Sequence, residues 1–160
     1  MWIIRISLDL YGDNFSPTKA LTEITDNIHI FSSNEPNDLN DKDPKGIYGF
    51  GSLSILSPQI YGLQYEVAEY EEWYLSFIDK YKPTLDKHGV TEINLFFDVF
   101  DNGSQLNFEI LSRDLLKKVG QHSIAIPISV NRLTTEAIID MLSETTIPQE
   151  KLRQFTEGPN

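Results

Sequence analysis

Carboxylate and amide side chains gather where the first apolar stretch of the chain ends. The segment LDLYGDNFSP, residues 8–17, places Asp9, Asp13 and Asn14 around Gly12. Such groups can bind a divalent cation or transfer protons. Asp and Asn are also the residues that a tight turn selects, because their side chains bond nearby backbone amides. We interpret this segment as a structural corner, with a metal-dependent hydrolase that uses Asp9, Asp13 and a distant histidine as the alternative.

The acidic segment NEPNDLNDKDPKG, residues 34–46, is a second source of oxygen ligands. An EF-hand loop beginning at Asp41 requires an acidic side chain at its twelfth position, where this chain has Ser52, and Pro44 interrupts the run of ligands. The segment therefore reads as a solvated loop, and the sequence predicts no bound metal.

The motifs of the common catalytic classes are missing from the sequence. The three histidines, His29, His88 and His122, do not stand at the spacing of a zinc-binding helix. Nucleophile elbows, phosphate-binding loops and dinucleotide fingerprints do not occur. The chain contains no cysteine, which excludes disulfides, thiolate nucleophiles and cysteine-based metal sites. We expect no cofactor, and the sequence favours binding over catalysis.

The charge balance points to the class of partner. The chain carries 24 acidic and 13 basic residues, for a formal net charge of −11. Such a field repels nucleic acid and anionic membranes, so we expect neither as a partner. It keeps a protein soluble, and it also attracts a basic protein. No signal peptide and no apolar stretch of membrane-spanning length is evident, so a cytoplasmic protein is expected.

Apolar periodicity predicts the elements that position these residues. Strands are expected at residues 4–11, 28–32, 47–56, 93–100, 106–110 and 124–130, and helices at 17–24, 67–88, 113–120 and 134–142. Pro83 predicts a kink or a restart in the long helix. Asn102–Gly103 predicts a hairpin turn, and Pro127 favours a sheet edge.

The resulting fold class is α+β, with a largely antiparallel sheet and helices packed on one of its faces. We expect residues 1–145 to form a single domain and residues 146–160 to form a polar C-terminal tail. Ser112 and Thr134 are the expected N-caps of the last two helices.

The order of elements carries a resemblance. A first strand is followed by Tyr11-Gly12-x-x-Phe15-x-Pro17, a short helix, a polar loop, a strand, a long helix and a Phe-rich strand. Over roughly residues 2–130 this order resembles the uncharacterised bacterial family catalogued as domain of unknown function 4279. That resemblance implies a fold and no chemistry. In size and charge the chain also resembles immunity proteins of bacterial toxin systems.

Aromatic side chains opposite the predicted core suggest a binding surface. Tyr48, Phe50, Phe96 and Phe100 fall on the strand faces away from the core. Aromatic anchors with an acidic rim suit a basic protein, such as a toxin or nuclease that an immunity protein neutralises. The alternatives are helices over both sheet faces, a homodimer through this face, or a small-molecule-binding domain. The residues expected to contact the partner are Glu66, Glu69, Glu72, Asp98, Asp101, Tyr48 and Phe96.

Overall fold

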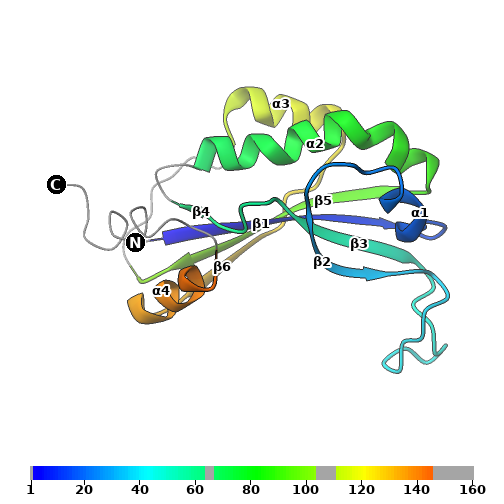
Figure 1. The fold of residues 1–160 in the computed structure, drawn as a ribbon, viewed down its shortest axis with the longest axis horizontal. Coiled ribbons are helices and arrows are strands. Elements are labelled where there is room, and N and C mark those ends of the chain that lie inside the picture. The colour runs from blue at the N-terminus through cyan, green and yellow to red at the C-terminus, as the bar shows by residue number, and fades with distance from the viewer. Residues whose placement is uncertain (1, 64–66, 104–110, 146–160) are drawn as a thin grey trace.

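A six-stranded sheet with helices on both of its faces forms the molecule (Figure 1). The computed structural model describes residues 2–63, 67–103 and 111–145. The strands are β1 (Trp2–Gly12), β2 (His29–Asn34), β3 (Gly51–Leu56), β4 (Gly62–Leu63), β5 (Glu92–Asp101) and β6 (Ile128–Arg132). The helices are α1 (Pro17–Leu21), α2 (Val67–Lys87), α3 (Arg113–Gln121) and α4 (Thr135–Ser143).

The central strand is β1. The strand order is β2-β3-β1-β5-β6, and β4 also pairs with β1. Strands β3, β4 and β5 run antiparallel to β1, whereas β6 runs parallel to β5 at the sheet edge. The predicted α+β class with a mostly antiparallel sheet is confirmed, as is the edge position that Pro127 favours.

Alternation along β1 and β5 separates the two faces of the sheet. Ile4, Ile6, Leu8 and Leu10 of β1 are fully buried, and they join the core cluster that includes the apolar side of α2. The matching residues of β5 are Ile93, Leu95, Phe97 and Val99. Helices α2 and α3 lie together on this face, as predicted (Figure 1).

Helix α4 lies on the other face, at one end of the sheet. Its Ile138 and Leu142 are buried against Ile3 and Phe100, which point away from α2. The helices are therefore not confined to one face, because the outward side of β1 begins with an apolar residue that needs cover.

Several sequence-based expectations about element boundaries are wrong. The strand expected at 124–130 lies at Ile128–Arg132, and the first helix ends at Leu21 rather than at residue 24. Helix α2 continues through Pro83 to Lys87 without a restart, and it ends as predicted at Gly89, which has a φ of +96°. Strand β3 begins at Gly51 rather than Ile47, because Gly49, with a φ of +77°, bonds through its N–H to Pro36 and turns the chain back onto the polar loop. The predicted strand at 106–110 and the tail at 146–160 lie outside the described residues.

Two tyrosines of α2 complete the hydrogen bonding of β1. On one edge, β1 pairs with β3 only from Leu8 onward and with β4 only at Ile3 and Ile4, which leaves Ile6 without a strand beside it. The Tyr70 hydroxyl accepts a hydrogen bond from the Ile6 N–H at 2.8 Å, and the Tyr74 hydroxyl donates one to the Ile6 carbonyl. Buried backbone groups require such partners. Burial raises the pKa of both tyrosines, which keeps their hydroxyl groups protonated.

The second bond of each hydroxyl reaches the connection between β3 and β4. The Tyr70 hydroxyl donates to the Ile60 carbonyl at 2.7 Å, and the Tyr74 hydroxyl accepts from the Ser57 N–H at 2.9 Å. The two side chains thus hold the helix, the central strand and the irregular edge together.

The corner after β1 is a packing joint. The Phe15 N–H donates to the Gly12 carbonyl at 3.1 Å, and the Phe15 ring is fully buried. A Cβ placed on Gly12 would lie 2.0 Å from the carbonyl oxygen of Gly89, so only glycine allows the end of α2 to approach this closely. The geometry accounts for the corner without a catalytic role.

Removing the Tyr74 hydroxyl tests the link between α2 and β1. Tyr74→Phe leaves the Ile6 carbonyl and the Ser57 N–H without their shared partner in the core, and we expect it to cost about 1–3 kcal/mol of the free energy of unfolding in a urea titration. Tyr81→Phe is the control, because the Tyr81 hydroxyl bonds Thr25 in a part-buried position. Equal losses in the two variants would contradict the assigned role.

The corner is tested by a pair of glycine substitutions. Gly12→Ala is expected to lower the free energy of unfolding by about 1–3 kcal/mol, because the added methyl group overlaps the Gly89 carbonyl. Gly120→Ala in α3 meets no atom within 4 Å, and it should raise stability by about 0.5–1 kcal/mol through helix propensity. Thermal unfolding of both variants measures the contrast, and a Gly12→Ala variant as stable as the parent protein would refute the packing argument.

Candidate binding surface

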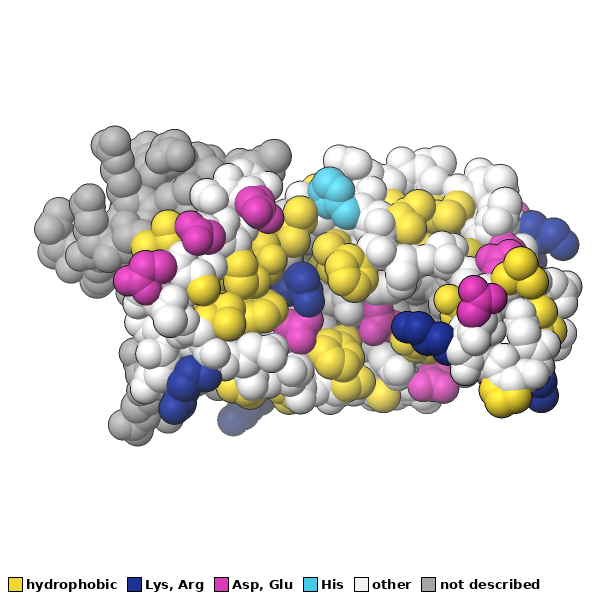
Figure 2. Space-filling view, turned by 90° about the horizontal axis from the view of Figure 1, so that it is seen from below, with side chains coloured by type: hydrophobic (Ala, Val, Ile, Leu, Met, Phe, Trp, Pro, Cys, Tyr) yellow, Lys and Arg dark blue, Asp and Glu magenta, His cyan; other side chains and the backbone are white. Residues whose placement is uncertain are grey.

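The sheet face opposite α2 and α3 is only partly covered. Helix α4 lies over one end of it and the loop of residues 35–50 hangs from the other, so the strands between them stay uncovered (Figure 1). We call this region the open face. Its side chains come from alternate positions of four strands, namely Arg5, Ser7, Asp9, Tyr11, Phe31, Ser52, Ser54, Asn94, Phe96 and Asp98. Figure 2 looks onto this face and shows hydrophobic side chains gathered on it with charged groups between them.

An ion pair occupies the middle of the open face. Arg5 of β1 and Asp98 of β5 are cross-strand partners, and the Arg5 Nη2 atom lies 2.7 Å from the Asp98 Oδ2 atom. The guanidinium also lies over two rings, 5.3 Å from the centroid of Phe31 and 5.6 Å from that of Phe100. Both charges are therefore engaged within the protein, and the pair links β1 to β5.

Beyond Asp9 the open face becomes aromatic and acidic. The rings of Tyr11 and Phe50 lie 6.3 Å apart, and Tyr48 meets Phe50 edge-on at 6.1 Å. A pocket of about 350 Å³ lies beside them, lined also by Asp13 and Glu92. The pKa of Tyr11 is raised, first by burial and then by the negative charges of Asp9 and Glu92. The electrostatic potential here is thus negative.

Three of the residues predicted to contact a partner lie on or beside the open face. Phe96 and Asp98 are its β5 members, and Tyr48 lies in the aromatic group at its acidic end. Asp98 is engaged by Arg5, so it is not a free carboxylate. This part of the predicted set is brought together.

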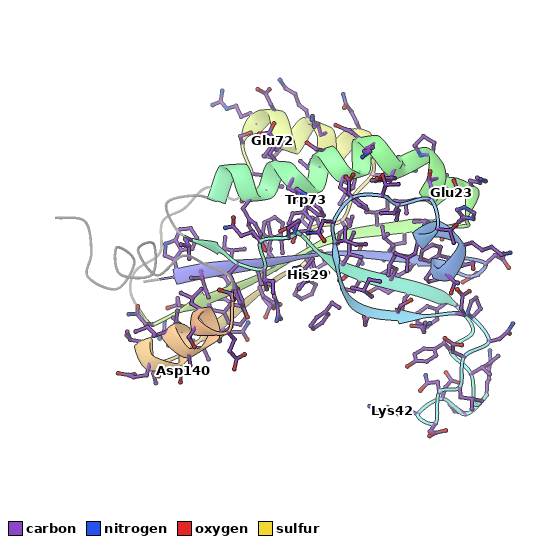
Figure 3. The ribbon with its side chains drawn as sticks, viewed as in Figure 1. Glu23, His29, Lys42, Glu72, Trp73 and Asp140 are labelled. Atoms are coloured by element: carbon purple, nitrogen blue, oxygen red, sulfur yellow. The ribbon has the colours of Figure 1, made fainter. Side chains whose placement is uncertain are left out.

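The other predicted residues do not join this surface. Glu72 is exposed on α2, across the sheet from Asp98 (Figure 3). Asp101 is only 3 % exposed and accepts a hydrogen bond from the Gly103 N–H at 2.5 Å, which is the contact of a turn residue. Glu66 and the side chain of Glu69 lie outside the described residues. The predicted set therefore divides between two sides of the molecule.

Sequence reasoning missed Phe31 and Glu92 as surface residues of interest, and it considered Asp13 only as a corner residue or a catalytic candidate. Phe31 reaches the open face because the β2–β3 register shifts between Ile30 and Ser32, and no sequence signal marks that irregularity. Glu92 had a usable signal, since the period-two alternation that buries Ile93 sends Glu92 to the outward face of β5, where the structure pairs it with Tyr11.

The candidate ligands of the hydrolase alternative have other partners. Asp9 accepts a hydrogen bond from the Ser54 hydroxyl at 2.5 Å, His88 meets Glu23 at 2.8 Å and His122 meets Asp79 at 2.7 Å. Among the residues that the structure describes, no three histidine, aspartate or glutamate side chains are grouped so that they could hold a metal ion.

The fold and this surface define an acidic α+β protein with one helix-covered sheet face and one open face. Comparison of the chain with protein-family models, with curated proteins and with solved structures finds no match. Within the described parts of the chain, no helix has both the length and the apolar character needed to cross a bilayer.

The ion pair of the open face can be tested by truncation. Asp98→Ala leaves the Arg5 charge partly buried between two rings, and we expect a loss of about 1–2 kcal/mol in the free energy of unfolding. Asp114→Ala is the matched control, because its pair with Lys117 is exposed and should contribute almost nothing. A urea titration compares them, and indistinguishable midpoints would show that the pair is no more than a surface contact.

Proposed function

We propose that this chain is a non-enzymatic protein-binding protein that docks a basic protein on the open face of its sheet. The concrete form is an immunity protein that neutralises a basic toxin or nuclease in the cytoplasm. The observation that carries the proposal is a sheet face with exposed aromatic side chains next to carboxylates that have no cationic partner among the described residues.

The exposed aromatic residues supply the anchors. Phe31 is 60 % exposed and Phe50 is 38 % exposed. Large apolar side chains grouped on a soluble protein mark an interaction site, and aromatic residues account for much of the binding energy at interfaces.

The charges select the class of partner. Asp13 and Glu92 take part in none of the salt bridges found among the described residues, whereas Arg5 is neutralised by Asp98. The acidic end of the open face thus adds to the net charge of −11. Such a surface attracts a basic partner and speeds its association, while the aromatic contacts slow its release.

The helical side of the molecule is the weaker candidate. Glu72 is exposed there, as are the aliphatic side chains of Leu116 on α3 and Val130 on β6, but the two large exposed aromatic side chains of the described residues, Phe31 and Phe50, belong to the open face. On the same side, Asp79 is already paired with Lys118 at 3.0 Å. Carboxylates without aromatic anchors beside them contribute to encounter and little to residence time.

The test is capture followed by measurement on purified components. The protein serves as bait in a lysate of its source organism, and each retained protein is identified by mass, purified and titrated by calorimetry. We expect a basic protein whose dissociation constant rises about tenfold or more with Phe31→Ala or Phe96→Ala, because each removes an anchor. Higher salt should slow its association.

The matched control is Glu72→Lys on the helical side, which should change the affinity much less than Glu92→Lys on the open face. A partner that responds to Glu72→Lys and ignores the open-face variants would overturn the proposed surface. Retention of further copies of the chain alone, through the same phenylalanines, would replace the proposal with a homodimer.

A further inference from the structure

We propose that the pocket beside Tyr11 and Phe50 receives an arginine side chain of the partner. This inference rests on the proposed function, and it specifies which chemical group the open face recognises. The argument comes from the walls of the pocket, from the hydrogen-bonding groups that line it and from its charge.

The walls suit a flat, weakly hydrated cation. Tyr11 and Phe50 form an angled pair of rings, 6.3 Å between centroids and tilted by 55°. The pocket volume of about 350 Å³ is ample for a guanidinium group with its methylene stem. Guanidinium groups stack on aromatic faces more readily than the compact, strongly hydrated ammonium of lysine.

The polar groups of the pocket include several hydrogen-bond acceptors. The Asn94 side-chain amide donates through Nδ2 to the Glu92 Oε1 atom at 3.1 Å, and this hydrogen bond orients the Glu92 carboxylate. Glu92 and Asp13 add carboxylate oxygens. Arginine offers five N–H donors and no acceptor, so it can satisfy such a set.

The charge of the pocket is uncompensated. Its lining contains Asp13 and Glu92 but no lysine or arginine. The cation of the open face, Arg5, lies four residues before Asp9 on β1 and is engaged by Asp98. A guanidinium bound here would supply the missing positive charge beside the two carboxylates and could at the same time stack on an aromatic ring.

The test uses two short peptides that differ in one group. Acetyl-Gly-Arg-Gly-amide and its citrulline counterpart, which replaces the guanidinium with a neutral urea, are titrated into the ¹⁵N-labelled protein. We expect saturable shifts at the Asn94 side-chain amide and at the backbone amides of Tyr11 and Thr91. The citrulline peptide should bind about tenfold more weakly, because it lacks the charge.

Variants of the pocket give the second arm of the test. Glu92→Gln and Phe50→Ala should each weaken the arginine peptide by about fivefold, and Glu72→Gln on the helical side should leave its affinity unchanged. Thermal unfolding and the unperturbed remainder of the spectrum establish that each variant is folded. A lysine peptide that binds as well as the arginine peptide would overturn the preference for guanidinium.

The outcomes separate this inference from the proposed function. If the arginine peptide produces no shifts at the pocket while a basic protein still binds through Phe31 and Phe96, the pocket assignment is wrong and the docking face stands. If the peptide binds but no basic protein does, the pocket stands and the proposed function fails. Equal binding of the arginine and citrulline peptides would also refute the inference.

Discussion

The structure depends on how the backbone hydrogen bonds of the central strand β1 are completed along its irregular edge. Strand β1 changes partner along that edge, from β3 to β4. The change leaves the N–H and carbonyl groups of Ile6 buried with no neighbouring strand to bond them. A buried peptide group without a partner costs free energy comparable to a lost hydrogen bond. Two phenolic hydroxyls from α2 meet this need, and in doing so they fix the helix over one face of the sheet. The position of α2, and with it the choice of covered face, follows from that constraint.

Once α2 and α3 cover one face, the other face becomes the part of the sheet that is free for function. Period-two alternation sends Arg5, Ser7, Asp9 and Tyr11 to that side. Apart from the end that α4 covers, these positions are polar, charged or aromatic rather than aliphatic. The protein can expose such a face to water, because polar and charged side chains are well solvated there, and the aromatic rings provide contact area for another protein.

Local patterns predicted much of the fold, and non-local contacts account for what they missed. The alternation of β1 and β5 and the caps of α3 and α4 are local, and Ser112 and Thr134 indeed accept the expected N–H bonds. Pro83 did not interrupt α2, because the packing of the flanking apolar residues on both sides of it outweighs the local cost.

The candidate surface was harder to predict than the fold, since it depends on which elements share a side of the sheet. Glu72 and Asp98 have equally acidic surroundings in the sequence, yet the sheet lies between them. The carboxylate of Asp98 is also committed to Arg5, a partner 93 residues away, and no local pattern encodes that pairing. Aromatic positions fared better, because the outward alternation that predicted Phe96 is a local property of its strand.

Net charge alone cannot specify a binding site on this protein. Carboxylates occur on every side, and several of them, including Glu23, Asp26 and Asp79, have lowered pKa values, chiefly because lysine or histidine side chains hydrogen-bond to them. These groups are neutralised where they stand, so they add little to recognition. Exposed charges act over about 8–10 Å at physiological salt and mainly affect the rate of encounter. Specificity must then come from places where a carboxylate outside the salt bridges adjoins aromatic walls, and in the described structure Tyr11, Phe50 and Glu92 combine these features.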